Sequence, residues 1–116
     1  MATRLEDRFG ELTGLGVTYT IIGSAVPSST TWNTLFTITN RTSASANLRL
    51  YIADNSWSSG EPTGGTLKAA IAYDLPIQAG AVEQIPGVIF KTTEKIVARS
   101  SVASSLDITA SGVAIT

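Results

Sequence analysis

The stretch "SLDITASGVAIT" at residues 105–116 alternates apolar residues with small polar residues up to the last residue of the sequence. Such alternation is typical of a β-strand that buries one of its two faces. The backbone groups of a buried strand need hydrogen-bonded partners. We therefore expect this strand to be paired, and we expect its partner to lie within the same chain.

The phase of the alternation slips inside this stretch. Leu106 and Ile108 are in step with Gly112, whereas Val113 and Ile115 are out of step with it. A glycine inside a strand often marks a β-bulge. We therefore expect a bulge at this glycine that keeps both halves of the strand facing the core.

The same strand pattern recurs along the chain from residue 15. Runs rich in Thr, Val, Ile and Ser are separated by Gly, Asn, Ser and Pro, and no long 3.6-residue periodicity interrupts them. Strands are predicted at residues 16–24, 31–40, 46–54, 66–77, 81–86, 88–91, 94–101 and 106–116. Short antiparallel strands with one apolar face each are stable when two sheets pack together. The predicted fold is all-β: an antiparallel β-sandwich of about eight strands, with a jelly-roll as one candidate topology.

Period two also assigns the faces of individual strands. In residues 46–54, Leu48, Leu50 and Ile52 share one face, with Arg49 and Tyr51 on the other. The run "EKIVARSS" at residues 94–101 carries several charges, which favours a strand at the edge of a sheet. A contact surface for another subunit is the alternative for that run.

The first fourteen residues differ in kind from the rest. Five of the first twelve residues are charged, and Leu5, Phe9 and Leu12 are spaced at i, i+4 and i+7. Glycines work against a long helix here. We interpret residues 1–14 as an N-terminal arm with at most two helical turns, followed by a β-sandwich domain at residues 15–116. The three apolar residues are predicted assembly contacts.

Composition excludes much chemistry. The 116-residue chain contains no Cys and no His, and its formal net charge is −1. Disulfides, thiolate metal sites and His-dependent catalysis are therefore excluded, and no basic surface for nucleic acid is predicted. No apolar run reaches the roughly 18 residues of a membrane span, and the charged N-terminus is unlike a signal peptide. We expect a soluble, non-enzymatic protein without cofactor or metal, made in a cytoplasm.

Trp57 lies in the middle of the loop "NSWSSGEPTGG", among Ser and Gly residues. Three interpretations stay open. The ring could cover the open end of the sandwich as part of the core. It could instead be an exposed protein contact, since Trp is enriched at interface hot spots, or a stacking platform for a sugar.

Two motif matches are weak. Asp54, Ser56, Ser58 and Glu61 place oxygen atoms at spacings that loosely resemble a calcium loop, but the required Gly and Glu are missing at the sixth and twelfth positions. The sequence "NRT" at residues 40–42 fits the glycosylation pattern. Because nothing in the chain indicates secretion, we attribute that match to chance.

Three stretches carry a resemblance to a known group of proteins. They are "TLFTITNRTSASANLRLYIAD", "IAYDLPIQAGAVEQIPGVIFKTTEKIVARSS" and the terminal "LDITASGVAIT". Together they resemble small accessory virion proteins of tailed bacteriophages, and the resemblance covers residues 31–116. Its motifs consist of turns and core strands and bring no catalytic residues.

The resemblance implies a non-enzymatic structural protein of a phage particle. A capsid decoration or cement protein that forms a homo-oligomer is the leading hypothesis, and attachment to tail, baseplate or fibre is the second. The expected partners are the major capsid protein or tail proteins, in the virion, without nucleic acid or membrane. The alternative from another class is a carbohydrate-binding module that uses Trp57.

Overall fold

The computed structural model describes residues 4–23 and 30–115, with side chains described from residue 10 onward. Within these ranges the chain forms eight strands and a single 3-10 turn. They are β1 (Arg4–Leu15), β2 (Thr20–Ile21), β3 (Thr31–Asn40), β4 (Ala46–Asp54), η1 (Gly64–Thr66), β5 (Leu67–Ile77), β6 (Val82–Lys91), β7 (Glu94–Ser100) and β8 (Leu106–Ile115). No helix in the described ranges has the length and apolar character needed to cross a membrane.

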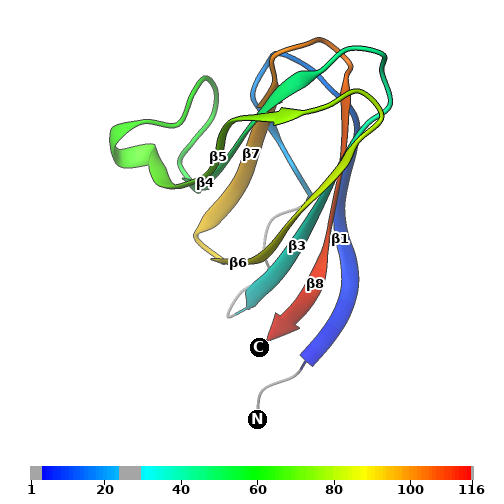
Figure 1. Cartoon of the computed structure of the whole chain (residues 1–116). Helices are drawn as coiled ribbons and strands as arrows, with labels where there is room; N and C mark the ends of the chain where they lie inside the picture. The colour runs from blue at the N-terminus through cyan, green and yellow to red at the C-terminus, as the bar shows by residue number, and fades with distance from the viewer. Residues whose placement is uncertain (1–3, 24–29, 116) are drawn as a thin grey trace.

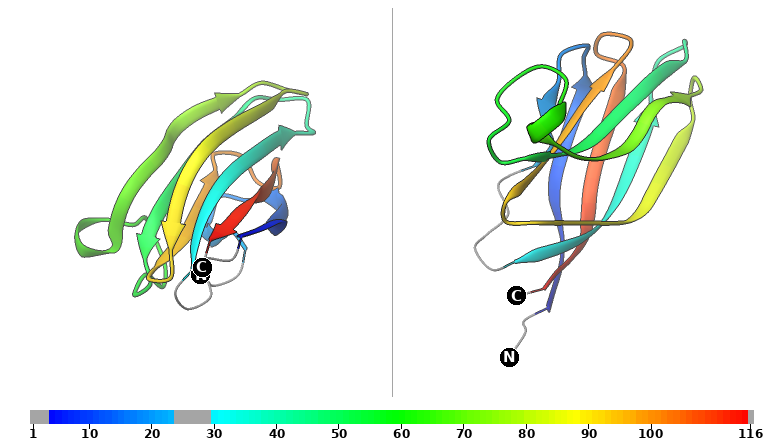
Figure 2. Two further views of the ribbon diagram at one scale, coloured as in Figure 1. Left: turned by 90° about the horizontal axis from the view of Figure 1, so that it is seen from below. Right: turned by 90° about the vertical axis from the view of Figure 1, so that its left-hand side faces the viewer.

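The strands form two antiparallel four-stranded sheets, which pack against each other in Figures 1 and 2. One sheet has the order β1-β8-β3-β6 and the other has the order β2-β7-β4-β5. The pairs β1·β8, β2·β7, β3·β6 and β4·β5 are nested, as in one long hairpin whose tip is the β4–β5 connection. Rolling such a hairpin into two sheets produces a jelly-roll. The predicted sandwich and its candidate topology are therefore confirmed.

The core lies between the two sheets. Its fully buried side chains come from alternate positions of the facing strands, as strand geometry requires. Leu48 and Leu50 of β4 face inward, while Arg49 lies on the outer face, as their alternation predicts. The largest fully buried apolar residues are Phe36, Leu15, Ile38, Leu48, Leu50, Ile77, Ile96, Leu106, Ile108 and Val97, of which Val97 lies on the outer face of its sheet.

The helical turns predicted within residues 1–14 are wrong, because residues 4–15 form β1 and pair with β8. A two-turn helix leaves most of its backbone donors and acceptors without partners, whereas pairing along a strand satisfies them. Leu15 is buried, and Leu12 is partly buried against the same core. Gly10 stands close to another backbone segment, since an added Cβ would lie 2.9 Å from Cα of Gly23. The division into arm and domain stays a prediction.

The C-terminal strand pairs within its own chain, which confirms that prediction, but the expected bulge at Gly112 is wrong. The register between β8 and β3 is continuous, and the register shifts lie in β1, between Arg8 and Gly10 and between Leu12 and Leu15. The inward alternation therefore continues to Ala114, and Ile115 is 42% exposed. Gly112 has another role: a Cβ there would overlap the carbonyl oxygen of Asn33.

Two further strands differ from their predictions. β7 is an interior strand between β2 and β4, so the edge position inferred from its charges is wrong. Lys95 and Arg99 alternate with the buried Ile96 and Ala98 and stand on the outer face of the sheet. The runs predicted at residues 81–86 and 88–91 form one strand, β6, whose register shift lies beside Gly87 at φ 70°.

We expect Gly112→Ala to destabilise the chain strongly. The residue has φ 155°, and the added methyl group would overlap the backbone of β3. Strain and overpacking together predict a loss of roughly 2 to 6 kcal/mol in the free energy of unfolding. Urea unfolding measures this change, with Ser111→Ala as the matched control in the same strand. Equal stability of the two variants would contradict the close approach of Gly112 to the backbone of β3.

Candidate functional site

The loop between β4 and η1 folds back over the outer face of the β2-β7-β4-β5 sheet. Trp57 anchors this loop, since it is 5% exposed and packs with Ala53 and Val97 in a small apolar cluster that Tyr19 flanks. The indole Nε1–H donates to the carbonyl oxygen of Gly60 at 2.8 Å. A large aromatic ring with its polar N–H satisfied is a stable anchor for a loop.

Backbone contacts hold the same tryptophan. The N–H of Trp57 donates to the carbonyl oxygen of Asp54 at 2.9 Å. The Lys95 ammonium group donates to the carbonyl oxygen of Trp57 at 2.9 Å. Trp57 is therefore not an exposed assembly contact or sugar platform, and those interpretations are wrong. It is buried, as the remaining interpretation requires, but it covers a sheet face and not the open end of the sandwich.

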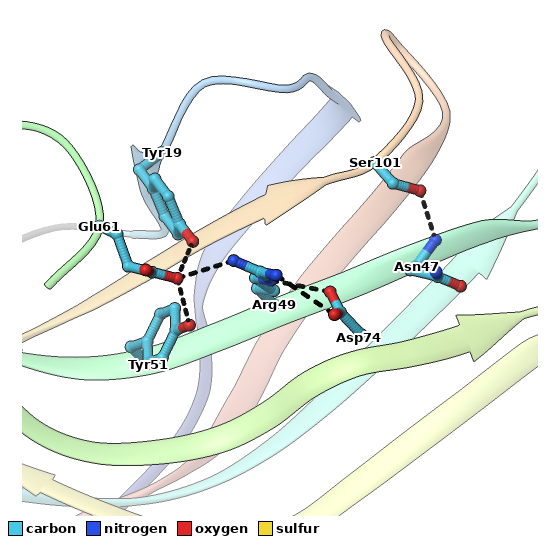
Figure 3. Close-up of polar contacts among 7 residues, drawn as sticks. All are labelled: Tyr19, Asn47, Arg49, Tyr51, Glu61, Asp74 and Ser101. Atoms are coloured by element: carbon cyan, nitrogen blue, oxygen red, sulfur yellow. Dashed lines mark hydrogen bonds and ion pairs between the residues drawn. The ribbon is translucent and has the colours of Figure 1, made fainter.

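The anchored loop presents Glu61 to the sheet, as Figure 3 shows. One carboxylate oxygen, Oε1, accepts hydrogen bonds from the hydroxyl groups of Tyr19 at 2.8 Å and Tyr51 at 2.9 Å. The same oxygen accepts from Nη1 of Arg49 at 2.8 Å. Three donors from β4 and from the segment before β2 thus meet on one loop residue.

Arg49 joins this group to β5. Its guanidinium binds both carboxylate oxygens of Asp74, at 2.7 Å and 3.2 Å, and lies 4.2 Å from the centre of the Tyr73 ring. Arg99 is the cross-strand partner of Arg49. Like charges directly opposite on a sheet repel. Asp74 and Glu61 supply the compensating negative charge.

An irregularity in β5 places Asp74 beside Arg49. Leu48 pairs with Leu75 and Leu50 pairs with Ala72, so β5 has one extra residue in this interval. Asp74 adopts φ 53°, a left-handed conformation that Asp tolerates better than most residues. The shift reverses the phase of the strand and leaves Tyr73 61% exposed. Tyr73 therefore lies on the outer face of the sheet, beside Arg49.

Four groups of this Tyr–Arg cluster (Tyr19, Arg49, Tyr51, Glu61, Tyr73, Asp74 and Arg99) have pKa values that are displaced away from neutrality. Hydrogen bonds from Tyr19 and Tyr51, with the charge of Arg49, lower the pKa of Glu61. The hydrogen bonds of Arg49 lower the pKa of Asp74, and that contact raises the pKa of Arg49. Burial raises the pKa of Tyr51 further from neutrality. None of these four groups is poised to exchange a proton near neutral pH, as a general acid or base must.

Described residues line two hollows at the surface. The first, about 250 Å³, borders the Tyr–Arg cluster and is lined by Tyr51, Glu61, Pro62, Thr63, Leu67, Ala70 and Tyr73. The second, about 310 Å³, lies where β3 begins and β6 ends, and is lined by Thr30, Thr31, Lys91, Thr92 and Thr93. The first is lined mainly by apolar groups, and the second by four threonines and one lysine.

The loosely calcium-like residues do not converge. Oδ2 of Asp54 accepts from the backbone N–H and hydroxyl group of Ser56, at 2.9 Å and 2.6 Å. Glu61 is directed to Arg49 instead. Within the described ranges no group of three or more His, Cys, Asp or Glu side chains could hold a metal ion.

Asn40, the first residue of the "NRT" match, is fully buried. Its side-chain amide donates to the carbonyl oxygens of Ala44 and Ile77, and its Oδ1 accepts from the backbone and hydroxyl group of Thr42. The residue therefore builds the β3–β4 turn. Its buried side chain explains why Asn stands at this position without any glycosylation.

The structure describes only one of the three assembly contacts predicted in the N-terminal segment. Leu12 is partly buried against the core of its own chain, as described above. The side chains of Leu5 and Phe9 lie outside the described part of the structure. A role of these residues in assembly stays a prediction.

Comparisons with known proteins agree with the fold. No protein-family model and no curated protein matches the sequence. A chain of the T13 IBDV viral particle is similar in structure, with a TM-score of 0.55 and 10% identity. The match covers 99% of this chain and 30% of that chain, so this chain spans less than a third of its length. The class defined here is thus an eight-stranded jelly-roll protein.

Two further solved structures match with lower TM-scores. A chain from the capsid of Helicobacter pylori bacteriophage KHP30 matches with a TM-score of 0.48 and 12% identity, covering 100% of this chain and 94% of that one. Anabaena sensory rhodopsin transducer matches with a TM-score of 0.43 and 18% identity, covering 90% and 99%.

We expect Trp57→Ala to cost about as much stability as a core substitution. Loss of the buried ring predicts roughly 3 to 5 kcal/mol of unfolding free energy, similar to Phe36→Ala between the sheets. Thermal and urea unfolding of both variants measure the losses, with Trp57→Phe as the milder control. A Trp57→Ala variant with wild-type stability would contradict the anchoring role.

Stability should fall in acid through the two carboxylates of the cluster. Because Glu61 and Asp74 have lowered pKa values in the folded chain, their contribution is present above the unfolded values near ~4 and is lost as pH falls further. Glu61→Gln should therefore lower the melting temperature at pH 7 and have a smaller effect at about pH 3. Glu83→Gln, in an exposed position of β6, is the matched control. An effect of Glu61→Gln that does not change with pH would argue against the charged contacts.

Proposed function

We propose that this chain is a non-enzymatic structural component of a tailed-phage virion, and most directly a capsid decoration or cement protein that assembles as a homo-oligomer. Attachment to a tail, baseplate or fibre is the second location within the same class. Its partners would be the major capsid protein or tail proteins.

The observation that carries this proposal is the nested strand order, β1-β8-β3-β6 against β2-β7-β4-β5. Jelly-rolls of this kind are common in viral capsid proteins, although lectins and cupins also use them. The likeness to a chain of the T13 IBDV viral particle supports the viral setting. The sequence resemblance over residues 31–116 supports the assignment to tailed phages.

The outer-face chemistry is consistent with this role. The Tyr–Arg cluster holds its carboxylates in contact with arginine and tyrosine. Such a surface can recognise a partner by shape, charge and ring stacking. Tyr73, exposed and stacked on Arg49, is the most accessible of its aromatic rings.

A carbohydrate-binding module remains the alternative class, but its intended platform is buried. Trp57 cannot stack on a sugar while its ring packs against β4 and β7. Under the proposed function, a glycan array probed with the purified chain should show no specific binding. A specific signal that Tyr73→Ala removes would favour the sugar-binding alternative.

Virions assembled from the genome that encodes this chain provide the direct test. We expect the chain to co-purify with particles through density gradients, and immunogold labels to lie over the capsid surface. Host proteins of similar size serve as the control for trapped contaminants. Labels confined to the tail would select the second location, and a chain found only in the soluble lysate would contradict the proposal.

A further inference from the structure

The outer face of the β1-β8-β3-β6 sheet differs from that of the opposite sheet. No described segment covers it, whereas the loop anchored by Trp57 covers part of the other sheet. Its two central strands present alternate residues that are small or apolar and uncharged, apart from Asp107. These residues are Thr31, Asn33, Leu35, Thr37 and Thr39 of β3, and Asp107, Thr109, Ser111, Val113 and Ile115 of β8.

Apolar side chains gather toward one end of this face. Ile89 of β6 is 60% exposed and is the cross-strand partner of Asn33, which also pairs with Val113 of β8. Ile115 is exposed in the neighbouring row, and Leu35 is half-buried between Ser111 and the bulge of β6. Apolar side chains gathered on one part of a sheet face are typical of a protein contact surface.

From these observations we infer that the outer face of the β1-β8-β3-β6 sheet binds the same face of a second copy of this chain, in a two-fold dimer. The inference deepens the proposed homo-oligomer by naming its interface. An isologous contact places each patch against a copy of itself. A face whose centre carries no charge can do this without repulsion between like charges.

The charges at the two ends of the face favour one orientation. Lys91 lies opposite Thr31 at one end, and Asp107 lies opposite Thr39 at the other. A two-fold axis that runs across the strands reverses the strand direction between copies. The Lys91 end of one copy then approaches the Asp107 end of the other. Arg41 already pairs with Asp107 in its own copy. The orientation is favoured because it keeps the two Lys91 side chains at opposite ends of the interface, where they do not repel each other.

The size of the face is sufficient for a specific contact. Four strands about 4.8 Å apart and about 34 Å long cover roughly 650 Å² on each copy, or about 1,300 Å² in total. Stable interfaces of ordinary size bury about 1,200 to 2,000 Å². The predicted dimer is therefore at the small end of the stable class.

Three of the four sheet edges are poorly suited to the alternative of edge-to-edge pairing. β2 has two residues, β5 contains Pro76, and β6 contains Pro86. Short strands and prolines are common protections against such pairing. The edge of β1 is the remaining competitor, and the experiment below separates it from the face.

Sedimentation of the purified full-length chain tests the inference without any virion, so its failure is distinguishable from failure of the proposed function. We expect the wild-type chain to be a dimer at about 100 µM. Leu35→Arg and Ser111→Arg place a charge on the centre of the face and should weaken the dimer at least about a hundredfold. Ala70→Arg, at an exposed position of β5 in the other sheet, is the matched control and should remain dimeric.

Charge exchange checks that the arginine variants are folded. Leu35→Arg and Leu35→Asp should each be monomeric with cooperative thermal unfolding, and an equimolar mixture should form a heterodimer. A monomeric or trimeric wild-type chain would overturn the inference. A dimer that Leu35→Arg leaves intact would also overturn it, and would direct attention to the β1 edge or to another face.

Discussion

The position of β8 between β1 and β3 is the constraint on which the rest of the roll depends. Both edges of this strand are hydrogen-bonded along almost its whole length. The strand joins the outermost pair of the nested hairpin to the next inner pair. Its approach to β3 is close enough at Gly112 that no side chain fits against the Asn33 carbonyl group. The core residues Leu106 and Ile108 are buried because this strand is held in place.

The two sheet faces that point away from the core have different chemistry. On β2-β7-β4-β5, charged and aromatic side chains are arranged around Arg49 and are joined by a loop that a buried tryptophan anchors. On β1-β8-β3-β6, the central strands present mainly hydroxyl, amide and aliphatic groups. Polar networks usually confer specificity, whereas flat uncharged surfaces permit close packing over a large area. A structural component that contacts other proteins as well as copies of itself can use both kinds of surface.

Much of the fold could be predicted from local patterns. The bounds of β3 and β4 agree with the alternating runs at residues 31–40 and 46–54, because each strand directs alternate apolar residues into the core and ends at turn residues. β1 was missed because its charges and its irregularity obscure the alternation. β6 was split in two at Gly87, and these two errors left the expected number of strands at eight. Charge alone also misplaced β7, since a strand interior to a sheet can carry charges on its outer face.

Less of the candidate site than of the fold could be predicted from the sequence. Alternation did place Arg49 and Tyr51 on the face opposite the core. It could not give the pairing of Arg49 with Arg99, because register depends on tertiary contacts. The extra residue that turns Asp74 outward and the folded-back loop that delivers Glu61 have no periodic signal. Trp57 was ambiguous for a related reason: what a loop residue packs against is decided by segments distant in the sequence.

The nested order of the strands has a consequence for how the chain folds. The pair β1·β8 joins segments separated by about a hundred residues of sequence, while β4·β5 is the most local pair. Contacts of such high sequence separation slow folding, because loop entropy is lost before the distant pairing forms. During synthesis, the inner hairpin can form early, but the edge of β3 that β8 later covers stays open until β8 has left the ribosome. Crowded nascent chains are therefore most vulnerable to misassembly along β3 in that interval.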